Sequence, residues 1–239
     1  MHRTRRTPLT GSTLLVGTLI ALYAASSVNA GPRLKRAVPG LPGPATSWVT
    51  SPRSGPIDAP VGNFGVISPG ALYRSAQPEG RDYAWLAENG IRSIVCLRKE
   101  HDDGADRMQR LGFQYLYLPI VDDRAPTDAQ ARAFLEFVRD PSHWPVLIHC
   151  HAGMGRAGTM AALARYAIDG WPMSTALREA RSYRLFGFRL NGTQRRWLNQ
   201  WKDRFAPGEY HPGRPLPPLA DSMSPPPAVR VPGPTTKRS

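Results

Sequence analysis

The segment from Val146 to Thr159 constrains the fold of this chain more than any other. It opens with the apolar run Val-Leu-Ile-His, continues as Cys-His-Ala-Gly-Met-Gly-Arg, and then becomes rich in small and apolar residues. A short run that is apolar on both faces is typical of a strand inside a parallel sheet. The following stretch, Ala157–Asp169, predicts a buried helix. A strand, a glycine-containing loop and a helix in succession indicate an α/β fold.

The same alternation continues through residues 61–205. Further strands are predicted at Ile91–Leu97 and Phe113–Leu118. Further helices are predicted at Asp82–Asn89, Ala105–Leu111, Asp128–Arg139, Ser174–Ser182 and Gln194–Phe205, with Thr127 as the N-cap of the third. We therefore expect one α/β domain over 61–205, with a central, mostly parallel sheet flanked by helices on both faces in three layers.

The regions outside this domain have a different composition. Residues 31–60 are rich in proline and glycine, which predicts a linker, and residues 207–239 hold ten prolines, which predicts a disordered tail over 206–239. At the amino end, Arg3, Arg5 and Arg6 precede the uncharged stretch Thr7–Ala30. This pattern predicts either an export signal over 1–30, cleaved after Ala30, or an uncleaved membrane anchor through residues 9–28. Both alternatives place the domain outside the cytoplasm or at a membrane.

The charge and the cysteine content of the chain argue against two classes of protein, nucleic-acid-binding proteins and disulfide-stabilised scaffolds. The net charge is +13, but residues 51–206 carry 21 basic and 16 acidic side chains, a net of only +5. This balance suits a small anionic group, and the sequence contains no nucleic-acid-binding motif. The two cysteines, Cys96 and Cys150, are too few for a disulfide scaffold.

The loop after the predicted strand has the chemistry of a phosphate cradle. Cys150 stands at the carboxyl end of the strand, where ligands bind in open α/β sheets. Glycines at 153 and 155 allow successive N–H groups to converge on an anion, and the helix amino terminus favours negative charge. Arg156 can hold two phosphate oxygens at once. These cationic surroundings favour the thiolate form of Cys150, the attacking form. The alternative is a buried core thiol before an ordinary turn.

The run from His149 through Arg156 resembles the signature of the protein tyrosine phosphatase superfamily, in its dual-specificity-type branch. Three further stretches resemble the same family: Leu72–Pro78, Gly90–Arg98 and Pro119–Thr127. The resemblance covers residues 62–200. It implies a metal-free and cofactor-free phosphomonoester hydrolase that works through a phosphocysteine intermediate.

The resemblance also implies the roles of individual residues. Cys150 is the nucleophile, and the phosphate is bound by the loop residues His151, Ala152, Gly153, Met154, Gly155 and Arg156. The general acid is Asp122 or Asp123, and the motif register favours Asp122; alternatively, the pair caps the following helix. His149 orients the loop or is structural. Gln194 positions the hydrolytic water or is an ordinary surface residue.

Two positions raise questions about turnover and redox control. The family usually has serine or threonine directly after the loop arginine, but this chain has Ala157, and Thr159 lies two positions further on. The hydrolysis of the phosphocysteine is therefore expected to be slow. Cys96, on the neighbouring predicted strand, is either a redox partner of Cys150 or a buried strand residue, which is the simpler interpretation.

Three functions follow as hypotheses. The first is a phosphatase for phosphorylated proteins. The second is a phosphatase for small phosphomonoesters such as inositol phosphates or phospholipid head groups. The third, suggested by Ala157, is a module that binds phosphorylated ligands without turnover. The expected partners are these phosphorylated substrates and, through the amino-terminal segment, a membrane; no nucleic-acid partner is expected.

Overall fold

The computed structural model describes residues 57–183 and 190–217, which lie within one compact unit, Leu34–Ser239. The predicted signal or anchor, most of the predicted linker and the end of the predicted tail lie outside the described residues. Within the described ranges, no helix is long and apolar enough to cross a membrane.

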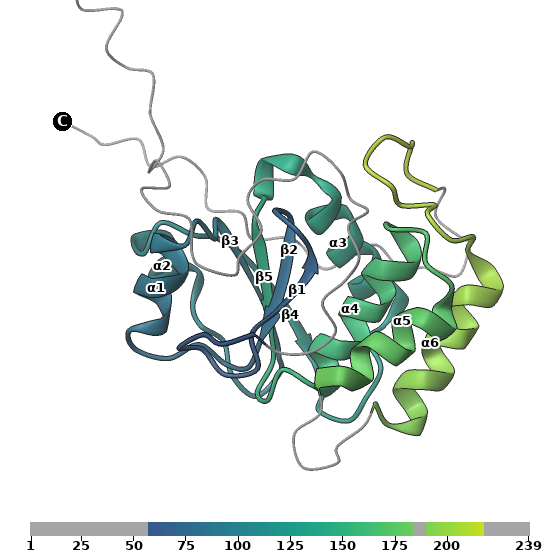
Figure 1. Cartoon of the computed structure of the whole chain (residues 1–239), viewed down its shortest axis with the longest axis horizontal. Coiled ribbons are helices and arrows are strands. Elements are labelled where there is room, and N and C mark those ends of the chain that lie inside the picture. Colours follow the sequence, from purple (N-terminus) through teal and green to yellow (C-terminus); the bar gives the residue numbers. More distant parts are fainter. Residues whose placement is uncertain (1–56, 184–189, 218–239) are drawn as a thin grey trace, which may run out of the picture. The chain divides into compact units, whose positions relative to one another are not determined.

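A five-stranded sheet forms the centre of this unit, in the order β1-β2-β5-β3-β4 (Figure 1). The strands are β1 Gly65–Ser68, β2 Leu72–Ser75, β3 Ser93–Arg98, β4 Gln114–Ile120 and β5 Val146–His149. Among the strands of the described ranges, only the β1–β2 pair is antiparallel. Strand β5, the central strand, is entirely buried, as its apolar sequence predicts.

Helices cover both faces of the sheet. They are α1 Asp82–Glu88, α2 Ala105–Arg110, α3 Asp128–Arg139, α4 Gly155–Ala167, α5 Met173–Ala180 and α6 Gly192–Arg204, with short 3₁₀ turns η1 Pro141–His143 and η2 Arg181–Tyr183. Helices α1 and α2 share one hydrophobic core with the sheet, and α3 to α6 share the other (Figure 1). The expected three-layer α/β fold with a mostly parallel sheet is confirmed.

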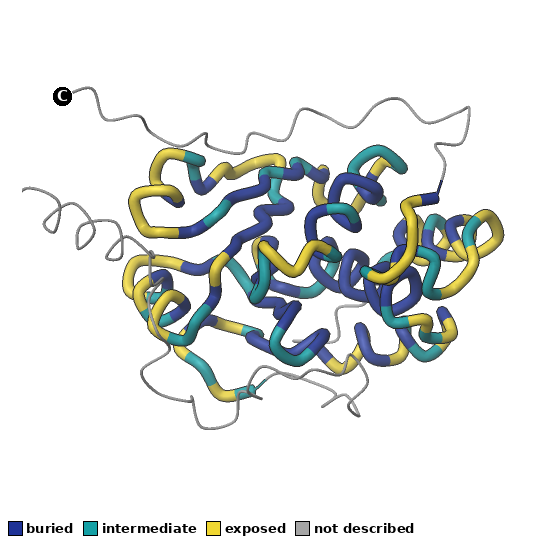
Figure 2. Tube along the Cα trace, turned by 90° about the horizontal axis from the view of Figure 1, so that it is seen from above, coloured by how far each residue is buried: buried dark blue, intermediate teal, exposed yellow. Residues whose placement is uncertain are grey.

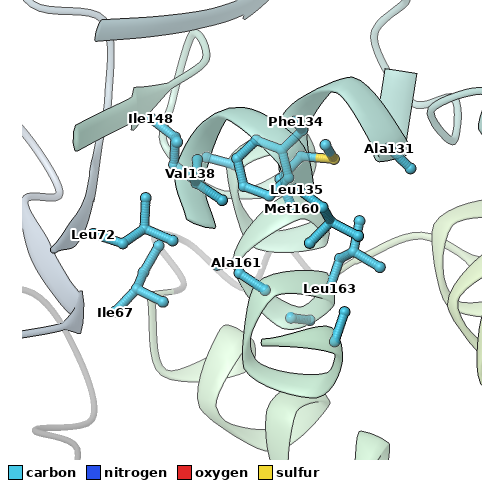
Figure 3. Packing of buried hydrophobic residues seen from close by; sticks show 14 of the residues in the cluster. Ile67, Leu72, Ala131, Phe134, Leu135, Val138, Ile148, Met160, Ala161 and Leu163 are labelled. Atoms are coloured by element: carbon cyan, nitrogen blue, oxygen red, sulfur yellow. The ribbon is translucent and has the colours of Figure 1, made fainter. Parts of the chain in front are cut away.

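The larger core is built around α4. Every residue of α4 from Arg156 to Ala167 is buried, because its alanines and glycine allow the neighbouring elements to approach closely. Figure 3 shows Met160, Ala161 and Leu163 of this helix packed between side chains of α3 and of strands β1, β2 and β5. In Figure 2 most buried segments run through the middle of the described part, and many of the exposed segments are loops at its edges. The beginning of α4, next to Cys150, is therefore held rigidly.

Two features differ from the sequence-based expectation. Strands β1 and β2 were not predicted, because they are only four residues long and hold buried polar residues such as Ser68 and Arg74, which hide the apolar pattern of a strand. The packed region also continues beyond residue 205. Tyr210 is fully buried, and its backbone N–H donates to the carbonyl of Ala167 at 2.8 Å.

Candidate active site

Cys150 lies at the carboxyl edge of the sheet, directly after β5 and between the ends of β2 and β3. Its side chain belongs to the core on the α3–α6 side, and the residue is 3% exposed. Residues 151–154 form a bend, and α4 begins at Gly155, so that Arg156 lies in the first helical turn. The predicted strand, loop and helix are therefore all present, with the thiol buried at the base of the loop.

Three successive carbonyls of this loop are held from outside. The carbonyl of His151 accepts from the backbone N–H of Gln77 at 3.0 Å, and that of Ala152 accepts from the side-chain amide of Asn63 at 3.0 Å. The carbonyl of Gly153 accepts from Nη2 of Arg74 at 2.7 Å. In a trans peptide the C=O and the N–H of the next residue point in opposite directions. The three outward carbonyls therefore turn the N–H groups of the residues that follow them toward the loop interior. Such convergent N–H groups form an anion-binding nest.

Gly153 is required at its position for two reasons. Its φ of +71° lies in the left-handed region, which side chains rarely adopt. A Cβ atom there would lie 2.7 Å from the backbone N of Ala76 and 2.7 Å from the backbone C of Ser75. The loop therefore touches the backbone of the chain just after β2, and only glycine permits this contact.

Arg156 presents a bidentate fork that already holds a carboxylate. Its side chain is 1% exposed, and its Nη1 and Nη2 donate to the two carboxylate oxygens of Glu100 at 2.7 and 2.9 Å. Nη1 also donates to the carbonyl of Ile120 at 3.2 Å. The hydrogen bond from Arg156 is the main reason that the pKa of Glu100 is well below its usual range. The guanidinium is thus oriented to bind two oxygens of one anion, and two oxygens of a phosphate can take the place of the carboxylate.

The two candidate acids have different environments. Asp122 is 71% exposed in its side chain, and its Oδ1 lies 3.3 Å from Nη2 of Arg156. Asp123 has a positive φ of 57°, and the side-chain amide of Asn191 donates to its carbonyl at 2.6 Å and to its Oδ1 at 3.3 Å. Thr127 caps α3 through the N–H of Gln130, so neither aspartate has this role. Asp122 faces the arginine, whereas Asp123 is fixed to the start of α6.

His149 is held by a buried carboxylate that the sequence did not reveal. Nε2 of His149 lies 2.8 Å from Oδ2 of Asp103, and both side chains are fully buried. An ionised carboxylate only accepts, so Nε2 carries the proton. The other oxygen, Oδ1, accepts from Gln77 at 2.8 Å and lies 3.1 Å from Nε2 of His101. Burial alone would raise the pKa of Asp103, but the bonds from His149 and Gln77 lower it overall.

Comparison with known proteins identifies the family. Residues 66–194, more than half of the chain, match the family model described as "DSP-PTPase phosphatase fused to NAD+ Kinase". The chain belongs to this DSP-PTPase phosphatase family. The dual specificity protein phosphatase TpbA of Pseudomonas aeruginosa (strain PAO1) is 33% identical over 109 residues, which are 45% of this chain and 49% of TpbA. The chain thus spans about half the length of this curated relative.

Solved structures of the same kind share the fold. The active form of Tk-PTP is 28% identical, with a TM-score of 0.52 over 59% of this chain and 97% of that one. The core catalytic domain of the PP-IP phosphatase SIW14 from S. cerevisiae is 21% identical, with a TM-score of 0.53 over 61% of this chain and 88% of that one. The second likeness shows the fold alone.

In this member of the phosphatase family, the residue after Arg156 is Ala157, which carries no hydroxyl group, and the described hydroxyl of Thr159 does not take its place. Ala157 is fully buried. The hydroxyl of Thr159 donates to the carbonyl of Gly155 at 2.8 Å, one turn back in the same helix. The hydroxyl hydrogen of Thr159 is therefore already bonded within its own helix.

Gln194 is buried and lies beside the loop of this phosphatase domain. It is the N3 residue of α6, and with Asn191 it forms a capping box. A Cβ atom on Gly155 would lie 3.5 Å from its Nε2, which also donates to the carbonyl of Arg124 at 3.3 Å. Gln194 therefore connects the cradle with the loop of Asp122 and Asp123, and it is not a surface residue.

Cys96 lies on the other face of the sheet from Cys150. It pairs with His149 in the β3–β5 register and belongs to the core on the α1–α2 side. Its thiol lies 3.4 Å from the carbonyl of His101, and burial raises its pKa to about 12. The thiol of Cys96 is thus protonated and faces away from Cys150, which favours the simpler interpretation of a buried strand residue.

Proposed function

We propose that this protein is a cysteine-dependent phosphomonoester hydrolase that acts on phosphorylated proteins through a phosphocysteine intermediate. The observation that carries the proposal is the loop after β5. Its carbonyls at 151 to 153 are held outward, and Arg156 presents a bidentate fork next to the buried thiol of Cys150. This arrangement matches a tetrahedral oxyanion, and it lies in the family-matched region.

The proposed reaction has two steps, the formation and the hydrolysis of the phosphocysteine, and each residue has a role in one or both. In the first, the thiolate of Cys150 forms a bond to phosphorus while the bond to the leaving oxygen breaks, and Asp122 gives that oxygen its proton. In the second, water attacks the phosphocysteine, Asp122 accepts the proton of the water, and the thiolate leaves. Throughout, the loop N–H groups and Arg156 hold the phosphoryl oxygens. We assign the orientation of the water to Gln194, which lies beside Gly155.

The interior of the loop supports a substrate with a single phosphate group. Positions Ala152 to Gly155 are neutral, and besides Arg156 only His151 adds a titratable side chain to the cradle. The relative TpbA is named a dual specificity protein phosphatase, which favours phosphorylated proteins as substrates. Small phosphomonoesters such as inositol phosphates are the alternative class, and comparing turnover of phosphopeptides with turnover of inositol phosphates distinguishes the two.

Hydrolysis of an aryl phosphate by the full-length protein, in the presence of a metal chelator, tests the activity. We expect metal-free turnover that Cys150→Ser reduces by about a thousandfold or more. Cys96→Ala is the matched control, because Cys96 is the other cysteine and lies on the opposite face of the sheet; its activity should stay near that of the wild type. Saturable phosphate binding without turnover, in both the wild type and Ala157→Ser, would instead indicate a binding module.

We further propose that residues 1–30 export the protein or anchor it in a membrane. The support is the sequence pattern of three arginines followed by an uncharged stretch. The mass of the protein recovered from soluble and membrane fractions tests this. Loss of residues 1–30 with a soluble product indicates a cleaved signal, and an intact chain in the membrane fraction indicates an anchor. An intact chain in the soluble cytoplasmic fraction contradicts both.

A further inference from the structure

Arg74 is a buried cation beneath the phosphate cradle. It lies on β2, opposite Ile148 in the β2–β5 register, two residues before Cys150. The residue is 0% exposed. Its Nη2 donates to the carbonyl of Gly153, and a Cβ atom on Gly158 of α4 would lie 3.1 Å from the same nitrogen. The guanidinium therefore fills the space between the sheet, the loop and the first turns of α4.

The charge of Arg74 has no direct ion-pair partner among the described residues. Its Nε and Nη1 make no hydrogen bond, and its plane lies over the ring of Tyr183, 4.0 Å from the centroid. The largest acidic influence on the pKa of Arg74 comes from Glu179 of α5. Glu179 is also buried, and its two carboxylate oxygens accept no hydrogen bond from the described residues. A buried cation without a paired anion is unfavourable, so a compensating negative charge nearby is expected.

The guanidinium of Arg74 also lies close to the reaction centre, because it holds the carbonyl of Gly153, three residues after Cys150. Burial is the largest influence on Arg74 and lowers its pKa, whereas the negative charges of Glu179, Tyr183 and Cys150 act in the opposite direction, and Arg165 of α4 acts with burial. Arg165 is itself paired with Asp169 at 2.9 Å, so its charge is largely neutralised. Among the described cations around the thiol, Arg156 is paired with Glu100 and Arg74 with no carboxylate.

We propose that Arg74 is a second, fixed cation of the active site: a positioning residue that turns the Gly153 carbonyl outward and favours negative charge on Cys150 and on the bound phosphate. Burial raises the pKa of Glu179, and in its ionised form Glu179 opposes this effect, because its carboxylate partly offsets the guanidinium. The inference rests on the proposed function for its purpose, but it concerns the charge of the thiol and the binding of phosphate, both of which can be measured without turnover.

Alkylation of Cys150 by iodoacetate across a range of pH tests the charge effect. The full-length protein is used, and the peptide containing Cys150 is followed by mass spectrometry, which separates it from the buried Cys96. We expect Arg74→Met to move the pH midpoint of alkylation upward by about one pH unit. Arg74→Lys keeps the charge and should move it less. Glu179→Gln should move it downward.

The opposite directions in which Arg74→Met and Glu179→Gln should move the alkylation midpoint distinguish an electrostatic effect from a general loss of stability. Arg132→Met is the matched control, because Arg132 of α3 is also buried but is paired with Glu136 at 2.7 Å, and its charge acts on Tyr210. It should lower stability without moving the midpoint. If Arg74→Met does not fold, Arg74→Lys and Glu179→Gln still test the sign. Midpoints that stay unchanged, or that move in the same direction in the Arg74 and Glu179 variants, overturn the inference.

Protection by inorganic phosphate tests the binding effect in the same samples. We expect the phosphate concentration that halves the alkylation rate to rise about tenfold in Arg74→Met, as for the loss of one charge-assisted interaction. Unchanged protection in a folded Arg74→Met protein contradicts the assigned role. If the wild type shows phosphate protection but hydrolyses no phosphomonoester, the proposed function fails while the role of Arg74 stands.

Discussion

At the scale of single residues, Ala157 sets the expected rate-limiting step. It follows Arg156 where a hydroxyl would assist the departure of the cysteine sulfur, and Thr159 is bonded to its own helix. We expect Ala157→Ser to raise the steady-state turnover of an aryl phosphate about tenfold, because one hydrogen bond to a charged sulfur contributes about 1.5 kcal/mol. Stopped-flow measurement should show a burst of alcohol release in the wild type that shrinks in the variant. An unchanged rate and burst would place the slow step elsewhere.

The two adjacent aspartates offer a second test at this scale. Asp122→Asn should lower kcat for an alkyl phosphate about a hundredfold, because Asp122 faces Arg156 and is the proposed donor of the leaving-group proton. Asp123→Asn should lower it far less, since Asp123 serves to hold Asn191 at the start of α6. Steady-state kinetics of both variants decides the assignment, and the reverse order of effects assigns the acid to Asp123.

The sequence alone can identify a site residue when the elements that position this residue are adjacent to it in the chain. Cys150 and Arg156 were found because the strand, the loop and the helix that present them are contiguous. Asn63, Arg74 and Glu100 were missed as parts of the site, because each lies 50 or more positions away in the chain and meets the loop only after the sheet has formed. Arg74 lies in the family-like stretch Leu72–Pro78, but the local sequence around these three residues does not show that they contact the loop.

At the scale of elements, the order of the strands builds the site. Because β5 lies between β2 and β3, the ends of all three meet at Cys150, and the segments that follow them contribute Gln77 and Asp103. The alternation of strands and helices predicted this parallel core. The β1–β2 hairpin could not be predicted, because β2 contains the polar residues Arg74 and Ser75. Both are buried next to the loop, so the strand lacks the apolar pattern by which a buried strand is recognised.

The buried Asp103, which lies where the ends of β2, β3 and β5 meet, should make the free energy of unfolding depend on pH. Its pKa is lowered in the folded state, so its stabilisation is fully present above the unfolded value of about 4 and is lost as the pH falls through the folded pKa. The free energy of unfolding, measured by urea titration, should therefore differ between the wild type and Asp103→Asn most strongly near neutrality. The difference should shrink below about pH 4. A difference that is constant over this range contradicts the role of the charge.

At the scale of the whole molecule, the packed domain includes the segment after α6. Tyr210 is fully buried and lies against Trp201 and Phe205, with ring centroids 6.2 and 6.4 Å away. We expect Tyr210→Ala to lower the free energy of unfolding by about 3 kcal/mol, as for a large aromatic removed from a core. Leu216→Ala, at a residue that is 44% exposed, is the matched control and should have little effect. Equal effects of the two variants would show that the segment is not part of the core.

The central claim, that Cys150 carries the phosphoryl group during turnover, is tested most directly by trapping that group. The full-length protein is mixed with an aryl phosphate, quenched in acid within the first turnover, and digested for mass spectrometry. The account predicts one phosphoryl group on the peptide that contains Cys150, in large yield because Ala157 slows its hydrolysis, and none in Cys150→Ser. Turnover that persists in Cys150→Ser, or a phosphoryl group that appears on another residue, would contradict it.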